Sequence, residues 1–512
     1  MRSPEALQGK NNILLPLSLF VVTIFTRIPF TSKILSHWDS VQFALATERY
    51  DITVHQPHPP GYFLYVMLGK FLNLLTNDAN TSFIAMSIVA SGLAVFFIFL
   101  LAKEMYDTTT AFWSSVLAIT SPFFWFYSEV ALTYMLEAFF SVFFAYLCWR
   151  ILAGEHRLIF LSAIVLALSG GIRQSTMVFL LPLWFYSIRR IPFKYILISF
   201  ALLIAGVLSW FLPMLSLTGG YERYKASVDE LWTYTVYPFT AINGGIESLL
   251  GNLKNIAQFI TYGLGLSAAF IAFYPFKDGF EGVKRNVLSK KSVFISFWIV
   301  PAILFYLFLH IGGSGYCLIF MPALVMVSVK TLNSLAGKSS FPSKILATFM
   351  LLAIVSNLYL FLYTNSPLSV YILERNHNDT MDFVRAVRKN FSSSDTAVLS
   401  PDYQFRGPRH FMYYMPEYRV YIMYERVDMR GRSRRLYWGQ NHKTFVSDAA
   451  YIPHGIKYFV SPIDDKNFLA EMKKSGEKIN ILFDKEKNVA FYGDISLAPK
   501  AYRGVKFVME DK

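Results

Sequence analysis

The sequence predicts a multi-span α-helical membrane protein with about eleven spans, followed by a C-terminal α/β domain. The first observation is the composition: 54% of the 512 residues are hydrophobic and 16% are charged, whereas about a quarter of a soluble domain is charged. The second is that the apolar residues form long uncharged blocks. The third is a change near residue 364, where charged residues become frequent and short β-rich runs begin. We therefore expect a membrane domain over residues 1–363 and an α/β domain over residues 364–512.

Each span is predicted from an uncharged apolar run that is long enough, or nearly long enough, to cross a bilayer. The first run has no small-residue cleavage site after it, so we interpret it as a span and not as a signal peptide. Two of the runs are short and could be either a tight pair or one broken element. The runs are 11–29, 80–102, 108–128, 130–150, 158–172, 174–188, 195–217, 255–275, 292–310, 315–329 and 345–363.

The basic residues between these runs predict the orientation, because cytoplasmic loops carry an excess of Lys and Arg. If the N-terminus is cytoplasmic, sixteen basic residues before residue 364 lie on the cytoplasmic side and eight on the other side. An odd number of spans then places the C-terminal domain outside. We expect a multi-pass protein of the plasma (inner) membrane with a cytoplasmic N-terminus and an exoplasmic C-terminal domain. This topology explains much of the formal charge of +14, so we expect no nucleic-acid partner.

The C-terminal domain of roughly 150 residues is long enough to bury its own core. Residues 379–391 alternate like an amphipathic helix, with Asp379 as its N-cap. The run FRGPRHFMYYMP from Phe405 is basic and aromatic, so it could either bind anionic glycan or lipid headgroups or form a solvated face. Strands are predicted from the β-rich runs TAVLS, YRVYIM, IKYFVS, INILF and NVAFYG.

The first outer loop, residues 31–79, is the most polar stretch early in the chain. It contains Asp39, three histidines and a Pro-Pro-Gly sequence. Its later part, GYFLYVMLGKFLNLL over residues 61–75, is apolar but too short to cross, which is typical of a helix lying in the membrane interface. We expect two interfacial helices, one after Asp39 and one after Gly61, with polar ends that face a cavity at the membrane surface.

Four motifs resemble those of a known superfamily. HWDSVQFA is similar to the Phe-Asp-Glu-x-His-Phe stretch of protein O-mannosyltransferases, and QPHPPGYFLYVMLGK resembles the His-Pro-Pro-Gly-Tyr loop of related membrane glycosyltransferases. SEVALTYMLEAFFS from Ser128 and GSGYCLIFMPAL from Gly313 resemble two further segments of the second group. The resemblance is to the GT-C superfamily of integral-membrane glycosyltransferases and covers roughly the first 330 residues. Ser40 stands where the mannosyltransferases have a second acidic residue, which leaves the acceptor and the acid–base arrangement open.

The resemblance implies a glycosyltransferase that moves a sugar from a polyprenyl-phosphate carrier to an outer-face acceptor, which could be a protein, a lipid or a glycan, with inversion. Such a transfer needs a base for the acceptor hydroxyl and positive charge for the departing phosphate. Asp39 is the candidate base; the alternative is a helix N-cap or a solvated loop carboxylate. The expected partners are the lipid-linked sugar donor, the acceptor and the bilayer.

Arg173 is the candidate ligand of the donor phosphate, and the alternative is an arginine that only extends to the headgroups. Glu129 could position the acceptor or a metal, or could be an interfacial anchor, and for Glu137 we favour a structural, hydrogen-bonded role. The other residues expected at the substrate site are His58, Tyr316 and His310.

His55 and His58 could bind a divalent metal together with Asp39, but two histidines beside prolines are more often ordinary loop residues. We therefore expect that no cofactor is required, although a divalent metal could take part. Two other classes of function remain. A membrane transporter or flippase for a lipid-linked or glycan substrate would favour charged residues at mid-bilayer and two matched halves. A membrane scaffold without catalytic activity would not need Asp39 or the His-Pro-Pro-Gly loop.

Overall fold

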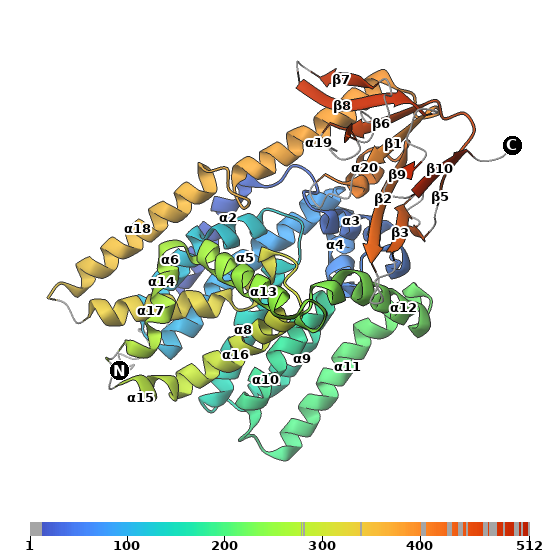
Figure 1. Ribbon diagram of the computed structural model, residues 1–512. Helices are drawn as coiled ribbons and strands as arrows, with labels where there is room; N and C mark the ends of the chain where they lie inside the picture. The colour runs from blue at the N-terminus through green and yellow to red at the C-terminus, as the bar shows by residue number, and fades with distance from the viewer. Residues whose placement is uncertain are drawn as a thin grey trace. The chain divides into compact units, whose positions relative to one another are not determined.

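The structure is a computed structural model with a mostly helical part up to Asn390 and two β-sheets in the residues that follow. This confirms the expected fold class, a multi-span helical membrane protein with a small C-terminal sheet domain (Figure 1). The residues that the structure describes are 13–277, 279, 282–337, 340–400, 406–427, 433–438, 444–446, 449–463, 469–470, 479–484, 487–495, 501–502 and 505–509.

Every apolar run predicted from the sequence contains a helix. Six described helices are long and apolar enough to cross a membrane: α5 (Ala79–Met105), α8 (Tyr134–Leu152), α11 (Phe193–Thr218), α13 (Ala241–Leu264, with its continuation to Ala272), α16 (Lys290–Phe308) and α18 (Pro342–Leu362). The remaining runs contain the shorter helices α2 (Leu14–Arg27), α6 (Thr108–Thr120), α7 (Pro122–Ser128), α9 (Leu158–Ile172), α10 (Gln174–Ile188) and α17 (Met321–Ala336). The number of eleven spans stays a prediction.

The chain forms two compact units, and neither is continuous in sequence. Unit 1 comprises Met1–Thr31, Tyr62–Leu217 and Phe239–Ile372, and unit 2 comprises Ser32–Gly61, Thr218–Pro238 and Leu373–Lys512. The sequence places the domain boundary at residue 363 and assigns the whole loop 31–79 to the membrane domain. In the structure the first half of that loop packs in the unit that also contains the sheets.

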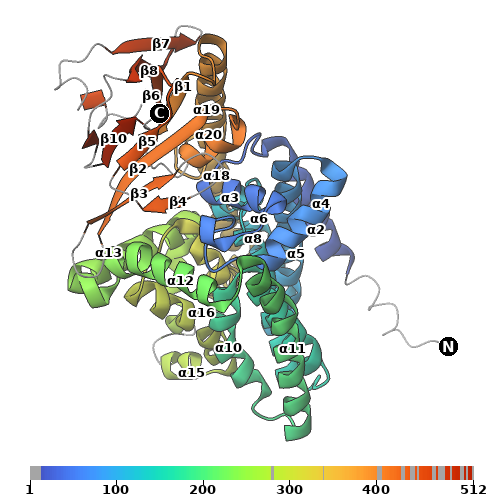
Figure 2. The same ribbon diagram turned by 90° about the vertical axis from the view of Figure 1, so that its right-hand side faces the viewer.

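Helix α5 is the central element of unit 1, where it packs against α2, α6 and α8 (Figure 2). Apart from Asn80 in its first turn and Lys103 and Glu104 in its last, its residues are apolar or small on all sides, and Ala94, Val95 and Ile98 are fully buried. A helix that is apolar all round is expected where other helices or lipid cover every face. The second helix predicted in the outer loop, α4 (Phe63–Thr76), also packs against α5.

Unit 2 contains a seven-stranded mixed sheet in the order β4-β3-β2-β1-β6-β8-β7. In its centre β1 is parallel to both β2 and β6, while β8 is antiparallel to β6 and β7. The five strands predicted from the sequence are confirmed as β1 (Thr396–Ser400), β2 (Arg419–Val427), β6 (Tyr458–Pro462), β7 (Asn480–Asp484) and β8 (Lys487–Asp494). The strands that were not predicted are β3 (Ser433–Trp438), which pairs with β2, and β4 (Thr444–Val446), which forms the edge of the sheet beyond β3. A second sheet contains β5 (Ala449–Ile452), β10 (Val505–Met509) and β9 (Ala501–Tyr502).

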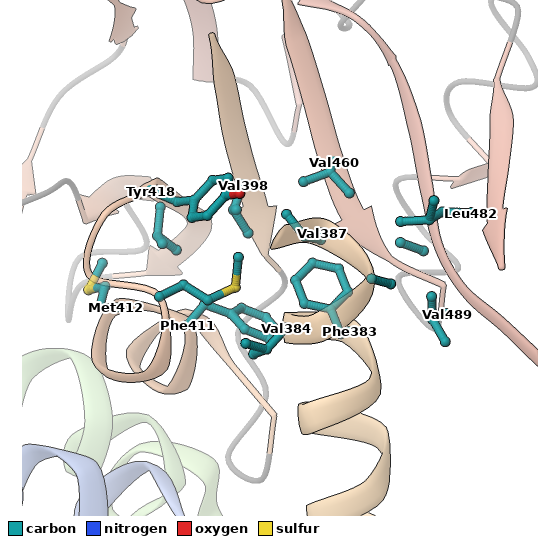
Figure 3. Packing of buried hydrophobic residues seen from close by; sticks show 14 residues of the cluster. Phe383, Val384, Val387, Val398, Phe411, Met412, Tyr418, Val460, Leu482 and Val489 are labelled. Carbon is teal, nitrogen blue, oxygen red and sulfur yellow. The ribbon is translucent and has the colours of Figure 1, made fainter. Parts of the chain in front are cut away.

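Helices α19 (Val370–Asn390) and α20 (Pro408–Tyr414) cover one face of the larger sheet (Figure 1). Figure 3 shows the core between them, in which Phe383 of α19 and Phe411 of α20 meet with ring centroids 4.5 Å apart. The strands contribute Val398, Val460 and other side chains that point to the same face. Because successive strand residues point to opposite faces, Ala397 and Leu399 belong to a separate core on the other side.

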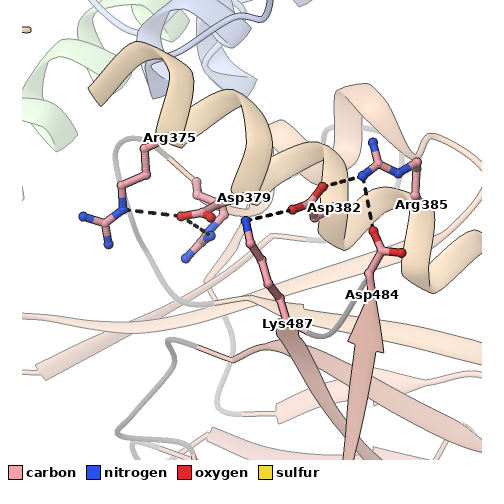
Figure 4. Close-up of polar contacts among 7 residues, drawn as sticks. Arg375, Asp379, Asp382, Arg385, Asp484 and Lys487 are labelled. Atoms are coloured by element: carbon pink, nitrogen blue, oxygen red, sulfur yellow. Dashed lines mark hydrogen bonds and ion pairs between the residues drawn. The ribbon is translucent and has the colours of Figure 1, made fainter. Parts of the chain in front are cut away.

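The predicted helix start at Asp379 is wrong, because α19 begins nine residues earlier at Val370. Asp379 lies inside the helix, where its carboxylate is 3.6 Å from Arg375 and 3.2 Å from Arg406 (Figure 4). Nearly two turns further along, Arg385 contacts both Asp382 of its own helix and Asp484 at the end of β7. The acidic residue that resembled a cap therefore contributes to an ion-pair network on the surface of the helix.

Candidate active site

Asp39 lies in the first turn of α3 (Trp38–Glu48), in unit 2. His37 is the N-cap of this helix, because its Nδ1 accepts a hydrogen bond from the backbone N–H of Asp39 at 3.0 Å. The capping role that was the alternative for Asp39 therefore belongs to His37. The Asp39 side chain is 26% exposed and lies at the positive end of the helix dipole, which favours a negative charge there.

The chain returns to Asp39 through a tight reversal before the Pro-Pro-Gly sequence. Asp51 and Gln56 form an antiparallel bridge, in which the N–H of Gln56 donates to the carbonyl of Asp51 at 3.0 Å. This reversal places Nδ1 of His58 3.4 Å from Oδ1 of Asp39. The His58 ring also lies 5.7 Å from the ring of Phe43, which is on the same face of α3 as Asp39 because the two are four residues apart.

His37 is a residue of this site that the sequence analysis did not select. Its Nδ1 lies 3.6 Å from Oδ2 of Asp39, so the carboxylate has an imidazole beside each oxygen. Both histidine side chains are mostly buried, at 18% exposed for His37 and 16% for His58. Histidine is not among the preferred N-cap residues, so the helix signals gave no reason to choose it. Because Nδ1 of His37 accepts the backbone N–H of Asp39, it has no proton to donate to the carboxylate, so His58 is the imidazole that can donate to Asp39.

A second cluster of functional candidates lies in unit 1 around Arg173, between α9 and α10. Its Nε is 3.7 Å from a carboxylate oxygen of Glu137 on α8, and its Nη1 donates to Thr133 Oγ1 at 3.3 Å. The other Glu137 oxygen accepts a hydrogen bond from Thr176 at 2.9 Å. Glu137 is 0% exposed, which agrees with the structural, hydrogen-bonded role favoured for it. Arg173 is 5% exposed, so it does not extend to a surface as the alternative interpretation required.

Tyrosine rings surround the Arg173 guanidinium. Its central carbon lies 4.4 Å from the ring centroid of Tyr316 and 4.9 Å from that of Tyr134. Gly312 lies against both Tyr316 and His310, because a Cβ at this position would be 3.2 Å from His310 Nε2 and from Tyr316 Oη. The structure therefore brings together three residues that the sequence assigned to substrate binding: Arg173, Tyr316 and His310.

Glu129 belongs to a different cluster of unit 1. It is 0% exposed and interacts electrostatically with Arg27 of α2. The Arg27 guanidinium lies 4.4 Å from the centre of the Trp125 ring and donates to the carbonyl of Ile119 at 2.6 Å. The burial of Glu129 does not fit the alternative of a simple interfacial anchor. Its contact with acceptor or metal stays a prediction.

The candidate metal ligands are His55, His58 and Asp39. Among the residues that the structure describes, no group of three His, Cys, Asp or Glu side chains is arranged to hold a metal ion. His55 is 7% exposed and has a left-handed backbone conformation, with φ of 56°. Asp39 and His58 alone are too few for a protein metal site, which usually supplies at least three ligands. The expectation that no metal is required stays a prediction.

The comparisons show what this chain is similar to: one segment matches a protein O-mannosyl-transferase model, and the fold resembles that of solved GT-C membrane glycosyltransferases. Residues 47–195 match the model of the protein O-mannosyl-transferase TMEM260 N-terminal domain. This segment contains His55, His58, Glu129 and Arg173, and it begins after Asp39. Among curated proteins no sequence matches this chain.

Solved structures of two other proteins resemble the whole chain. The crystal structure of ArnT from Cupriavidus metallidurans bound to undecaprenyl phosphate has a TM-score of 0.56 and 11% identity, and covers 95% of this chain and 98% of ArnT. The apo state of the same protein gives 0.55 and 10%, with 96% and 99% covered. The Archaeoglobus fulgidus oligosaccharyltransferase in its apo form gives 0.53 and 11%, with 95% and 72% covered. At these identities the likeness is one of fold, and the GT-C fold expected from the sequence is confirmed.

Proposed function

We propose that this protein transfers a sugar from a polyprenyl-phosphate carrier to a hydroxyl group of an outer-face acceptor, with Asp39 as the general base. The observation that carries the proposal is the carboxylate of Asp39, which is partly exposed and has an imidazole within 3.6 Å of each of its oxygens. A lipid-linked donor is supported by the ArnT structure, which contains undecaprenyl phosphate, and by the match to a mannosyltransferase model. The acceptor could be a protein, a lipid or a glycan.

In the proposed reaction the acceptor oxygen attacks the anomeric carbon of the sugar while Asp39 takes the hydroxyl proton. The bond between the anomeric carbon and the phosphate oxygen breaks, and the polyprenyl phosphate leaves with the bonding electrons. Attack opposite to the leaving group inverts the anomeric configuration. His58 orients the carboxylate and also remains our candidate for contact with the substrate, while His37 caps the helix that carries Asp39. General-base catalysis of this kind contributes between about 100- and 10 000-fold in rate.

We assign the departing phosphate to Arg173. The 3.7 Å separation between Arg173 and Glu137 is longer than a hydrogen bond, so the ion pair does not use the full donor capacity of the guanidinium. An arginine can bind a phosphate through two parallel hydrogen bonds, and burial strengthens that interaction. Tyr316 and His310 would line the same part of the site.

The orientation proposed from the basic residues is a cytoplasmic N-terminus and an exoplasmic sheet domain in the plasma membrane. It places the Asp39 loop on the outer face, where a lipid-linked donor presents its sugar. We propose that no metal is required, because Arg173 supplies positive charge for the phosphate.

The test is a transfer assay with purified full-length protein in detergent and a panel of radiolabelled polyprenyl-phosphate sugars, beginning with mannose. Asp39→Asn keeps the shape of the side chain but cannot accept the proton, so turnover should fall by at least about 100-fold. Asp51→Asn is the matched control: it makes the same charge change in the same loop, and an amide oxygen can still accept the N–H of Thr53. The control should retain turnover.

Near-normal turnover in Asp39→Asn would exclude this residue as the base. Movement of an intact lipid-linked sugar across a liposome membrane, without cleavage of the sugar–phosphate bond, would instead favour the transporter or flippase.

A further inference from the structure

Helix α20 of the sheet domain contains two buried polar residues, Arg409 and His410. Both are 0% exposed. They belong to the basic and aromatic run that the sequence assigned to headgroup binding or to a solvated face, and both interpretations are wrong for these two side chains. A buried guanidinium is costly unless it makes hydrogen bonds, so its partners indicate what the helix does.

These partners lie in the loop that carries Asp39. Nη2 of Arg409 donates a hydrogen bond to the carbonyl of Val54 at 2.6 Å, and the backbone N–H of Leu35 donates to the hydroxyl of Tyr414 at 2.8 Å. Leu35 precedes α3, and Val54 lies in the reversal that leads to His58. Helix α20 therefore contacts the chain both before and after Asp39, through backbone groups that no change of loop side chain would remove.

Helix α20 is also fixed to the sheet. Phe411 and Met412 are buried in the core formed with α19 and the central strands (Figure 3). Trp38, the residue next to Asp39, packs against this same core. A rigid packed core thus extends from the sheet through α20 to the first turn of α3, and packed interiors transmit small displacements.

We propose that Arg409 and Tyr414 are positioning residues, which hold the loop over residues 32–61 so that Asp39 and His58 keep their productive geometry. This inference rests on the proposed function of Asp39 and extends it, because it gives the C-terminal domain a role in catalysis. Catalytic groups must be held closely, and displacement by about 1 Å can cost about 100-fold in rate. Neither residue needs to touch the substrate.

Two tyrosines of the same core allow a matched comparison. Tyr414→Phe removes the acceptor of the Leu35 N–H, whereas Tyr418→Phe removes a hydroxyl that donates to the carbonyl of Phe391 at 2.8 Å, within the sheet domain. Each change removes one hydroxyl together with the hydrogen bond just described, so the two variants should have similar melting temperatures. We expect kcat to fall about tenfold in Tyr414→Phe, with the donor KM within about twofold of wild type, and to be unchanged in Tyr418→Phe.

Hydrogen–deuterium exchange of the full-length protein gives a readout that does not depend on activity. Peptides over residues 32–61 should exchange faster in Tyr414→Phe than in Tyr418→Phe, because a held backbone N–H is released. Arg409→Met should have the larger effect, and Arg409→Lys should restore part of it, since an ammonium group can still donate to the Val54 carbonyl.

Equal kcat and equal loop exchange in the two tyrosine variants would overturn the inference. Faster loop exchange with an unchanged kcat would overturn it as well, because the loop would then be held without any effect on the base. A wild-type protein that transfers no sugar from any donor would overturn the proposed function instead. In that case the exchange comparison would still decide whether α20 holds the loop.

Discussion

Replacement of Arg173 by alanine should affect both the stability of unit 1 and the use of the donor. Glu137 is 0% exposed, and of the two polar contacts described above it would retain the hydrogen bond from Thr176 once the guanidinium is gone. Removing one partner of a buried ion pair typically costs about 3–5 kcal/mol, because the other charge is left without compensation. The single variant therefore cannot separate a donor-binding role from a structural one.

The double variant Arg173→Ala/Glu137→Gln separates them. Glutamine has no charge to leave unpaired, and its side-chain oxygen can still accept the hydrogen bond from Thr176. We expect the double variant to regain much of the lost stability. The donor KM should remain raised at least about tenfold, since a charge-assisted hydrogen bond to phosphate contributes about 1.5–3 kcal/mol.

The assay measures melting temperature and the apparent KM for donor and acceptor separately, in the wild type, both single variants and the double variant. Arg150→Ala is the control, because Arg150 pairs with Glu104 and Glu155 and its side chain is 30% exposed, so its loss should cost less than about 1 kcal/mol. A donor KM that returns to the wild-type value together with stability would refute the phosphate role. Arg173 would then be a structural partner of Glu137.

Three further predictions test the topology, the metal and the sheet domain. Alkaline phosphatase fused after residue 364 should be active and a fusion after residue 284 inactive; the reverse result would overturn the orientation. Transfer activity should survive EDTA, and inhibition that manganese, magnesium or zinc reverses would contradict this and make His55 and His58 the next residues to replace. Burial is the main reason, and the nearby His37 a smaller one, why the pKa of His410 is lowered from 6.5 to about 3. The His410 imidazole therefore stays neutral in the folded protein at pH values where the same imidazole in the unfolded chain takes up a proton, that is, as the pH falls below 6.5. The contribution of this neutral imidazole to the free energy of unfolding should be fully present above pH 6.5 and decrease by about 2 kcal/mol at pH 5. The melting temperature of His410→Asn should fall less over this pH range than that of the wild type. An equal fall in the two proteins would contradict the lowered pKa of His410.

Local sequence patterns predict much of this fold. An uncharged run of sufficient length has no stable alternative to a helix in a bilayer, and every such run contains one. The strand β1 begins and ends with the run TAVLS, whose five residues are all buried. Strands such as β3, with the sequence SRRLYW, were not predicted because charged residues interrupt the β-rich pattern. The start of α19 was misplaced because a side chain that can cap a helix can equally pair with arginines inside it.

The site could be predicted only where the partners are close in sequence or share a motif. Asp39 and His58 are linked by one loop, so their approach needed only a reversal of the chain, which Gln56 and Asp51 provide. The contact between Arg409 and Val54 joins residues 355 positions apart, and no periodicity or motif encodes such a pairing. The burial of α20 could not be predicted for the same reason. The residues that cover this basic and aromatic helix are distant from it in sequence, and only the packed unit shows them.

Unit 2 is built from three separate stretches of chain, so the Asp39 loop can reach its final conformation only after the last stretch has been synthesised. Ser32–Gly61 is synthesised first, Thr218–Pro238 later, and the stretch that begins at Leu373 last. Until the ribosome has produced α20, the backbone groups of Leu35 and Val54 lack the partners that hold them in the finished protein. A nascent or truncated chain that stops before Pro408 would therefore contain Asp39 and the six long apolar helices, yet would lack the α20 groups that hold the backbone of Leu35 and Val54.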